Sequence, residues 1–585
     1  MTKSVTTLTD KYVEESGRIQ IGALQAYVRL LLDQARRDRA EGVASAGYVT
    51  GYRGSPVTTL DAQLWGAGEL LAEHDIRFEP GLNEELAATS LRGTQQLGWF
   101  GTPRVEGVFA LWYAKGIGVD RAHEALKLGN LEGAAHRGGV LLLAGDDHAA
   151  KSSASAHQSD QNLAAAFVPT LYPATNAEIL SYGQYGWALS RYSGLYCGMK
   201  AVTDTLDLTA SVDLPGWTFP IHTPNTPGPA RNLREGMSAL EQEALTVRHR
   251  LPAAQAFVRA NRLDRVTHGR ADTRGGLVIV TAGKAWLDTA QALLDLGLDA
   301  GRCRELGITV LKLALTWPVD PEIVKQVCTP AREVLVIEEK RGWIEDQIAR
   351  ILYGVAPAPA LSGKTDPQGR PLLRAEGVLD PSEVRAGLVR RLQDLGRSDP
   401  PLDARAEALA LADERAQGLS MVAARPAYFC SGCPHNRSTQ VPEGSSAMGA
   451  TGCHGLAHYM PGRRTMQTVG MGSEGTPWIA AQHFVDTPHY FQNLGDGTYT
   501  HSGLLAIRAS VAAKSAVTYK ILYNDAVAMT GGQPMEGGLT PQQIVREMVT
   551  EGVDPGEGYL GDPLRADLRQ REAPPPQARP ARRSR

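Results

Sequence analysis

Two short segments late in the chain carry residue types that hold a divalent metal ion on a diphosphate. Leu494-Gly495-Asp496-Gly497-Thr498 is a glycine-rich turn, and Asn524 stands at the end of the next apolar run. Mg²⁺ takes one or two protein oxygens and completes its octahedron with phosphate and water, which suits a carboxylate and an amide. The glycines let the backbone turn sharply and lie close to phosphate. The pair therefore predicts a Mg²⁺–diphosphate site.

The elements that must position these side chains are a strand, a helix and a second strand. We expect strands at residues 489–494 and 517–523 and a helix at residues 502–513 between them. Asp496 and Asn524 then lie at the carboxyl ends of neighbouring parallel strands, where open α/β sheets bind ligands. The alternative is an ordinary Gly-Asp turn. The asparagine at the second strand end and the Gly-Gly pair that follows favour the metal site.

A second glycine-rich turn, residues 469–475, precedes a predicted helix at residues 476–484. Backbone N–H groups of Gly472, Ser473 and Glu474 at a helix start suit diphosphate oxygens. The same turn matches the dinucleotide pattern GxGxxG, with Asp496 at about the distance of the ribose-binding acid. The preceding run is a poor buried strand, and Asp496 lies between glycines. A nicotinamide site therefore stays the weaker alternative.

Three cysteines near these turns suggest a metal centre. Cys430 and Cys433 form a CxxC, and Cys453 follows. Thiolates at such spacing bind iron–sulfur clusters or zinc. No cysteine follows Cys453, whereas a [4Fe–4S] cluster normally takes four, and a zinc site could use His435 or His454. Three unrelated thiols are the alternative. The other cysteines are scattered and predicted to be core or surface thiols: Cys197, Cys303 and Cys328.

The first third of the chain has three polar segments of interest. Ser55 lies in a turn, residues 51–56, after a predicted strand. Glu84 begins an Ala-rich helix, where its carboxylate could bond a heterocycle nitrogen or simply complement the helix dipole. From these residues alone we favour the dipole interpretation. Residues 146–148 and 157–160 form a polar loop that could line a substrate pocket or be a solvated connection.

Composition indicates a soluble globular protein of several domains. The chain has 585 residues, 43% apolar and 21% charged, with a net charge of −3. This length predicts about three or four domains. The small net charge gives no case for nucleic acid or an anionic membrane, and neither a membrane-spanning run nor a signal core is visible. The predicted compartment is the cytoplasm.

Alternating strand-like and helical runs predict a multi-domain α/β protein. We expect domains at residues 1–240, 272–395 and 400–553, followed by a Pro/Arg-rich disordered tail at 554–585. A helical connector is predicted at residues 231–270, a loop at 357–371 and a helix at 404–417. Further predicted strands are residues 46–52, 105–111, 139–143, 277–281, 308–313 and 334–338, and further predicted helices are 285–296 and 343–352.

Taken together, the motifs resemble the thiamine-diphosphate-dependent 2-oxoacid:ferredoxin oxidoreductases, specifically the indolepyruvate ferredoxin oxidoreductase family. The resemblance covers residues 45–550 and is most specific at Gly495-Asp496-Gly497-Thr498 through Ala528-Met529-Thr530-Gly531-Gly532-Gln533. It also includes Tyr52-Arg53-Gly54-Ser55-Pro56, Asn83-Glu84-Glu85, Cys430 to His435, Gly452-Cys453 and Gly472-Ser473-Glu474-Gly475.

The resemblance implies two doubly wound thiamine-diphosphate-binding domains and a transketolase C-terminal-like domain between them. Glu84 would bond the aminopyrimidine, and Ser55 would offer the substrate a hydroxyl. Gly472, Ser473, Glu474, Gly495, Gly497 and Thr530 would surround the cofactor in the diphosphate domain. Asp496, Asn524 and the Ala526 carbonyl would hold Mg²⁺, and Cys430, Cys433 and Cys453 would ligate a [4Fe–4S] cluster.

The implied reaction is oxidative decarboxylation of a 2-oxoacid, such as the aryl pyruvate indolepyruvate. Electrons would pass through the cluster to ferredoxin, and coenzyme A would take the acyl group. A homodimer is expected. The fourth cluster cysteine, the two-cluster ferredoxin segment and the γ-type domain of long fused relatives are not found in the sequence, which suggests a truncated form or a separate completing chain. The alternatives are a non-redox thiamine decarboxylase or ligase, and an inactive or partner subunit stabilised by zinc.

Overall fold

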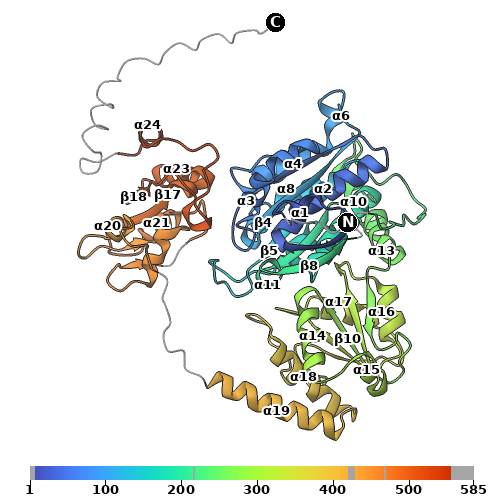
Figure 1. Cartoon of the computed structure of the whole chain (residues 1–585). Helices are drawn as coiled ribbons and strands as arrows, with labels where there is room; N and C mark the ends of the chain where they lie inside the picture. The colour runs from blue at the N-terminus through green and yellow to red at the C-terminus, as the bar shows by residue number, and fades with distance from the viewer. Residues whose placement is uncertain (1–6, 215–217, 419–427, 467–468, 555–585) are drawn as a thin grey trace. The chain divides into compact units, whose positions relative to one another are not determined.

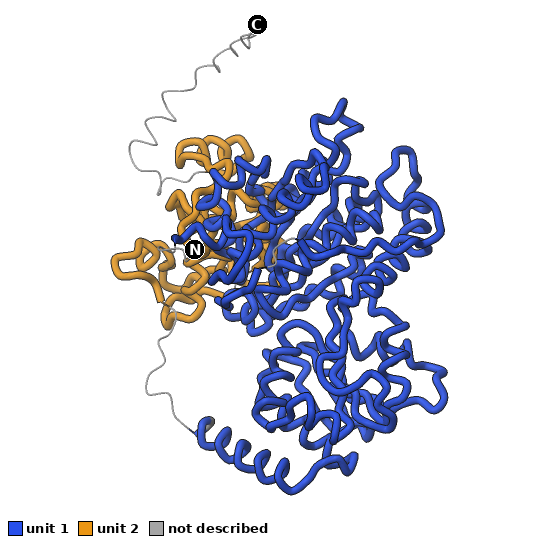
Figure 2. Tube along the Cα trace, turned by 45° about the vertical axis from the view of Figure 1, so that its right-hand side comes forward, with its two compact units in different colours: residues 1–424 blue, residues 425–585 orange. Residues whose placement is uncertain are grey.

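A computed structural model describes residues 7–214, 218–418, 428–466 and 469–554. The chain forms two compact units, residues 1–424 and 425–585, which are described separately (Figure 2). Most of the predicted tail lies outside the described residues. The multi-domain α/β class with mainly parallel sheets is confirmed.

The larger sheet of the first unit is parallel except at one edge. Every residue of its β5 strand and nearly every residue of β4 is buried, because helices cover both faces. This explains the continuous apolar runs that predicted these strands. In spatial order the strands are β12 (Leu315–Trp317), β6 (Thr170–Leu171), β7 (Cys197–Val202), β5 (Val140–Asp146), β4 (Gly107–Lys115), β2 (Ser45–Gly51) and β3 (Ile76–Phe78).

Alternate residues of β4 enter two different cores. Phe109 and Leu111 pack in the core that includes α2 (Ala23–Ala40) and α10 (Asn176–Ser193). Ala110 and Trp112 pack in the opposite core, with α5 (Glu84–Gln95) and α8 (His123–Glu132). The alternation follows from the strand period of two. The sheet is therefore a helix–sheet–helix sandwich (Figure 1).

The second sheet of this unit is smaller. Its strands are β14 (Ala360–Ser362), β13 (Glu333–Ile337), β10 (Leu277–Ala282), β11 (Ile308–Leu313) and β9 (Arg265–His268), and β9 is antiparallel. The strands predicted at 277–281, 308–313 and 334–338 are confirmed to within a residue. Its helices are α14 (Gly283–Asp295), α15 (Ala300–Leu306), α16 (Pro321–Cys328), α17 (Ile344–Leu352), α18 (Pro381–Asp394) and α19 (Pro400–Gln417).

Two expectations in this region are wrong in part. The connector predicted as helical contains α12 (Ala239–Leu245), a π-helix (Thr246–Arg250) and α13 (Leu251–Ala260), but it ends in strand β9. The predicted loop at residues 357–371 contains strand β14. Both strands are short and lie at sheet edges, where the apolar pattern is weak.

Strand β12 joins the two sheets. It follows β11 of the smaller sheet, yet it pairs antiparallel with β6 of the larger one, with Leu315 opposite Leu171. The Tyr172 N–H donates to the Ala314 carbonyl at 2.9 Å, and the Thr316 hydroxyl donates to the Thr170 carbonyl at 3.2 Å. Tyr172 also packs in the core of the smaller sheet. The two sheets are therefore linked by β12 and share part of a core.

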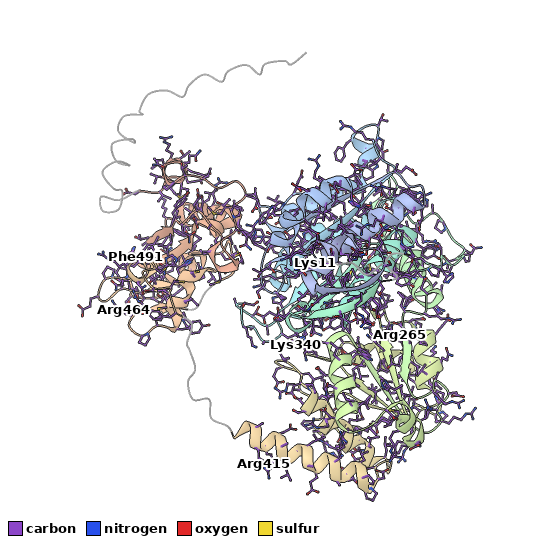
Figure 3. The ribbon with its side chains drawn as sticks, viewed as in Figure 1. Lys11, Arg265, Lys340, Arg415, Arg464 and Phe491 are labelled. Atoms are coloured by element: carbon purple, nitrogen blue, oxygen red, sulfur yellow. The ribbon has the colours of Figure 1, made fainter. Side chains whose placement is uncertain are left out.

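The second unit contains a parallel sheet with the order β16 (Thr465–Met466), β15 (Ala447–Met448), β17 (Tyr490–Gly495) and β18 (Val517–Leu522). Phe491 of β17 lies between Ala447 and Thr518 of the flanking strands (Figure 3). The predicted parallel pair is confirmed. The helix predicted at 502–513 is α23 (Leu504–Ala512), preceded by a π-helix (Tyr499–Gly503). Its other helices include α20 (His435–Ser438), α21 (Thr476–Ala481) and α24 (Pro541–Glu551).

The remaining elements of the first unit are short. None of the helices in the described ranges combines the length and the apolar content that a bilayer crossing requires. Strands β1 and β8 form an antiparallel ribbon. The short remaining elements of the first unit are α1 (Asp10–Val13), β1 (Gly17–Gly22), α3 (Leu60–Gly66), α4 (Gly68–Glu73), α6 (Leu97–Phe100), α7 (Gly116–Arg121), α9 (Asp160–Ala165), α11 (Thr203–Leu206) and β8 (Thr209–Leu214).

Candidate cofactor site

The Gly-Asp-Gly turn and the asparagine loop meet at the carboxyl ends of β17 and β18. Asp496 is 3% exposed. Its Oδ2 accepts the backbone N–H groups of Asn524 at 2.8 Å and Asp525 at 2.7 Å, and its Oδ1 accepts the Gly497 N–H at 2.9 Å. The register of the parallel strands puts Gly495 opposite Leu522, which brings the two loops together. The structure therefore places both predicted Mg²⁺ ligands at one sheet edge.

The donor set at this edge suits Mg²⁺ on a diphosphate. Asp496 supplies a buried carboxylate, and the exposed Asn524 supplies an amide oxygen that accepts the Ala526 N–H at 3.1 Å. These oxygens are hard donors and keep free lone pairs. The loop that follows is closed on itself: Val527 pairs with Gln533, and the Thr530 hydroxyl donates to the Gln533 side chain at 2.7 Å. Thr530 thus stiffens the asparagine loop.

The second glycine-rich turn is held against the same sheet. Glu474 is fully buried, and its Oε2 accepts the Gly472 N–H at 2.7 Å. The Gly475 N–H donates to Gln492 at 2.8 Å, and the Tyr519 hydroxyl donates to the Glu474 carbonyl at 2.8 Å. The Gly472 N–H is thus engaged inside the turn. The helix that follows, α21, is shorter than the predicted 476–484.

The three clustered cysteines lie near one another in the second unit. Cys430 is exposed, whereas Cys433 and Cys453 are half-buried. Burial raises the pKa of Cys453, and the neighbouring Cys433 and Cys430 add to that rise, so the three thiols interact. However, no three His, Cys, Asp or Glu side chains among the described residues converge as a metal ion requires. The thiols in this arrangement do not form a complete ligand set.

Two imidazoles that follow the cysteines in the chain lie near the Gly-Asp-Gly turn: His454 is against Gly495, and His435 is within electrostatic range of Asp496. The rings of His435 and His454 lie 5.9 Å apart, edge to face. His454 is 2% exposed, and burial lowers its pKa to about 3, with His435 adding to that shift. Burial also lowers the pKa of His435, against the attraction of Asp496. Neither the ring packing nor the full burial of Asn493 in β17 has a signal in the sequence.

Glu84 begins helix α5 of the first unit. The Asn83 side chain caps the helix by accepting the Leu86 N–H at 2.9 Å. Glu84 is 5% exposed, whereas Glu85 beside it is exposed. A carboxylate that only complemented the helix dipole would stay solvated, so the burial favours a specific role over the dipole interpretation. The Glu84 side chain packs on Gly118, where a Cβ atom would lie 2.8 Å from Oε1.

Ser55 is half-buried in the turn after β2. The turn is anchored by Arg53, whose Nε donates to Asp61 Oδ2 at 2.8 Å, and by the Val57 N–H, which donates to the Gly54 carbonyl at 2.8 Å. Gly54 lies against the side chain of Lys115 from the end of β4, where a Cβ atom would be 2.5 Å from Lys115 Cδ. Lys115 was not among the residues predicted from the sequence.

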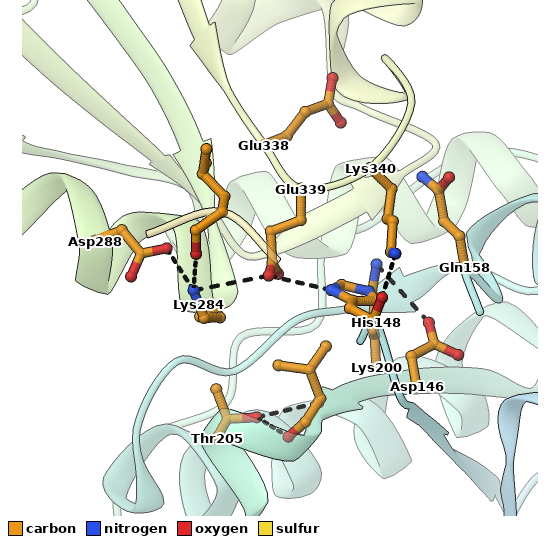
Figure 4. Close-up of polar contacts among 12 residues, drawn as sticks. Asp146, His148, Gln158, Lys200, Thr205, Lys284, Asp288, Glu338, Glu339 and Lys340 are labelled. Atoms are coloured by element: carbon orange, nitrogen blue, oxygen red, sulfur yellow. Dashed lines mark hydrogen bonds and ion pairs between the residues drawn. The ribbon is translucent and has the colours of Figure 1, made fainter. Parts of the chain in front are cut away.

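The polar loop at residues 146–160 is anchored by charges from the smaller sheet. Glu339 lies between His148, at 3.1 Å from Nδ1, and Lys284, at 3.8 Å from Nζ (Figure 4). The Tyr172 hydroxyl donates to Glu339 at 2.9 Å. Burial disfavours the Glu339 anion, but its contacts with His148, Lys284 and Lys200 outweigh that effect and lower the pKa of Glu339 to about 2. The loop at residues 146–160 and the segments that carry Lys284 and Glu339 are far apart in the chain, so the sequence pattern does not predict that they meet.

Comparisons with known proteins point to one family. Residues 265–416 match the family model described as "Indolepyruvate oxidoreductase domain". The chain is 24% identical to the "Indolepyruvate oxidoreductase subunit IorA" of Methanothermobacter marburgensis, over 87% of this chain and 76% of that protein. The protein of the same name from Archaeoglobus fulgidus is 24% identical over 85% of this chain and 75% of its own length.

Among solved structures, the chain is similar to a 2-oxoglutarate:ferredoxin oxidoreductase from Magnetococcus marinus with 2-oxoglutarate, coenzyme A and succinyl-CoA bound. The TM-score is 0.45 at 13% identity, and the match covers 65% of this chain and 66% of that chain.

Proposed function

We propose that this chain is a thiamine-diphosphate-dependent 2-oxoacid oxidoreductase of the indolepyruvate ferredoxin oxidoreductase family, which the family model and the relatives support. The observation that carries the proposal is the edge of the second unit's sheet. There the buried Asp496 carboxylate holds the Asn524 loop through two backbone N–H groups, at 2.8 and 2.7 Å. Carboxylate and amide oxygens at the ends of parallel strands suit Mg²⁺ on a diphosphate.

The protein's own residues would have distinct tasks. Asp496, Asn524 and the Ala526 carbonyl would hold Mg²⁺ and so fix the diphosphate. When bound, thiamine diphosphate supplies the nucleophilic carbon and the electron sink for decarboxylation. The Glu84 carboxyl group would share a proton with the aminopyrimidine ring nitrogen in a hydrogen bond. The burial of Glu84 strengthens such a bond. Ser55 would offer its hydroxyl to the substrate.

The finer assignments are also proposals. The substrate would be an aryl pyruvate such as indolepyruvate, and coenzyme A and ferredoxin would accept the acyl group and the electrons. Relatives are named as subunits, so we propose a partner subunit that supplies the γ-type domain, together with a homodimer of this chain. Cys430, Cys433 and Cys453 would bind the [4Fe–4S] cluster. In the described part of the chain, these three thiols alone do not form a complete ligand set.

The test is Mg²⁺-dependent binding of thiamine diphosphate, measured by isothermal titration calorimetry. Asp496→Asn keeps the size of the side chain but removes the charge, and we expect binding to weaken more than tenfold, or about 1.4 kcal/mol or more. Asp525→Asn is the matched control, because Asp525 is exposed and its φ of 58° suits asparagine. The control should bind as the wild type does.

Four outcomes would count against the proposal. Wild-type protein that binds NAD but no thiamine diphosphate in a thermal-shift assay would favour the nicotinamide alternative. Equal affinity of Asp496→Asn and wild type would remove Asp496 from the site. Zinc in place of iron in anaerobically purified protein, without thiamine diphosphate binding, would favour a zinc-stabilised partner subunit. Turnover without iron would instead indicate a non-redox decarboxylase or ligase.

A further inference from the structure

Lys115 lies where the two candidate site segments of the first unit come together. It is the last residue of β4, directly before α7, at the carboxyl edge of the larger parallel sheet. Its alkyl chain lies on Gly54 of the Ser55 turn, where a Cβ atom would be 2.5 Å from Cδ. Three residues further along the chain, Gly118 contacts the Glu84 side chain. Such sheet edges are where α/β proteins bind ligands.

The ammonium group of Lys115 has N–H donors that no acceptor in the described residues uses. Within the described residues its Nζ has one hydrogen-bond acceptor, the Ser152 carbonyl at 2.9 Å, whereas an ammonium carries three N–H donors. The side chain is half-buried. Burial lowers the pKa of Lys115, and the Asp147 and Glu84 carboxylates oppose that shift, so both lie within electrostatic range. A partly desolvated cation with open donors suits an anionic ligand.

The neighbouring charged groups are already engaged. Asp147 Oδ2 accepts the Ser152 N–H at 2.8 Å and the Ser153 hydroxyl at 3.2 Å, which fixes the carbonyl that Lys115 contacts. Arg53 is 3% exposed and paired with Asp61. Of the two cations beside the Ser55 turn, Arg53 is already paired, and Lys115 is therefore the one positioned to bind a further anion.

We propose that Lys115 binds the carboxylate of the 2-oxoacid, beside the Ser55 turn and the Glu84 carboxylate. This inference rests on the proposed function. The substrate's carboxylate loses its charge when CO₂ departs, so an ion pair with it stabilises the bound substrate more than the transition state. Lys115 therefore selects acids over uncharged analogues, and its loss raises KM without lowering kcat.

The experiment compares wild type with Lys115→Gln, using holoenzyme for kinetics and calorimetry for binding. We expect kcat/KM for an aryl pyruvate to fall about 10- to 100-fold, mainly through KM, since a charge-assisted hydrogen bond is lost. Lys115→Arg should restore part of the loss. Lys127→Gln, on α8 of the same unit, is the matched control and should behave as the wild type does.

Binding of unreactive ligands separates this inference from the proposed function. Phenyllactate keeps the carboxylate but has no reactive carbonyl, and the diol with CH₂OH in place of the carboxylate lacks the charge. Wild type should prefer the acid, and Lys115→Gln should lose the preference without losing thiamine diphosphate affinity. Equal acid binding by both proteins, or no acid preference in wild type, would overturn the assignment. Failure of the proposed function would instead appear as wild type without thiamine diphosphate binding.

Discussion

At the scale of single residues, Glu338 links a helix start to pH. Its carboxylate is 6% exposed and accepts the backbone N–H groups of Trp343, Ile344 and Glu345, each at 2.9 Å, where α17 begins. Burial raises the pKa of Glu338 to about 7, and these hydrogen bonds oppose the rise. Burial outweighs the hydrogen bonds because it withdraws the carboxyl from water.

We predict that this carboxyl makes the folded state less stable as the pH rises. A pKa raised from about 4.5 to about 7 means that the folded state binds the proton more tightly than the unfolded state. The contribution is complete below pH 4.5 and is lost as the pH rises through 7, which amounts to about 3 kcal/mol. Glu338→Gln does not titrate, so its urea midpoint should change less between pH 5 and pH 8 than that of wild type.

The exposed Glu376 provides the control for this measurement. Glu376→Gln should keep the wild-type dependence of the urea midpoint on pH. If Glu338→Gln and Glu376→Gln follow the same curve as wild type, Glu338 does not carry the titration.

At the scale of elements, one carboxylate ties a loop of the larger sheet to the smaller sheet. Glu339 follows β13 and faces His148, Tyr172 and Lys284. The next residue, Lys340, donates through Nζ to the His148 carbonyl. Because these groups are buried, removing the Glu339 charge takes away attractions that water screens only weakly.

We predict that Glu339→Gln lowers the free energy of unfolding by about 3 kcal/mol, since it removes the buried anion that His148, Tyr172 and Lys284 face. Glu305→Gln is the matched control, because Glu305 pairs with Arg302 at 2.8 Å on the surface, with a side chain 66% exposed. It should cost less than about 1 kcal/mol. Urea unfolding curves measure both. Similar losses in the two variants would mean that the Glu339 network adds no stability.

Sequence patterns predict the buried central strands better than the strands at the edges of the sheets. Strands β10 and β11 were recognisable because both faces are covered, which makes their apolar runs continuous. Strands β9, β12 and β14 were missed because they are short edge strands whose pairing depends on distant segments. The meeting of Asp496 and Asn524 followed from parallel pairing alone. Lys115 and Glu339 could not be foreseen, since their partners come from loops far apart in the chain.

At the scale of the whole molecule, the cysteines divide between the two units. Those of the first unit are buried, and burial raises the pKa of each thiol: Cys303 to about 11 and Cys328 to about 12, with Cys197 also raised. Those of the second unit are exposed or half-buried. Thiol reactivity requires access and ionisation, so the two sets should react at different rates.

We predict that a thiol reagent such as DTNB modifies Cys430, Cys433 and Cys453 in native protein without bound metal. Cys197, Cys303 and Cys328 should react only after unfolding. The absorbance of released thionitrobenzoate, followed with and without guanidinium, measures both phases. The triple variant with serine at the three second-unit positions is the control and should lack the early phase. An early phase that persists in this variant would show that the first unit opens readily.

Strand β12, which connects the two sheets of the first unit, limits how this protein can be recombined. Strand β12 belongs by sequence to the smaller sheet, but it completes the edge of the larger one beside β6. A chimaera that exchanged the smaller sheet with that of a relative, at a breakpoint before β9 (Arg265–His268), would therefore also replace an edge strand of the larger sheet. The foreign segment would have to match Thr170 and Leu171 as well as its own core. We therefore expect both sheets of the first unit to be exchanged together, in evolution and in protein engineering.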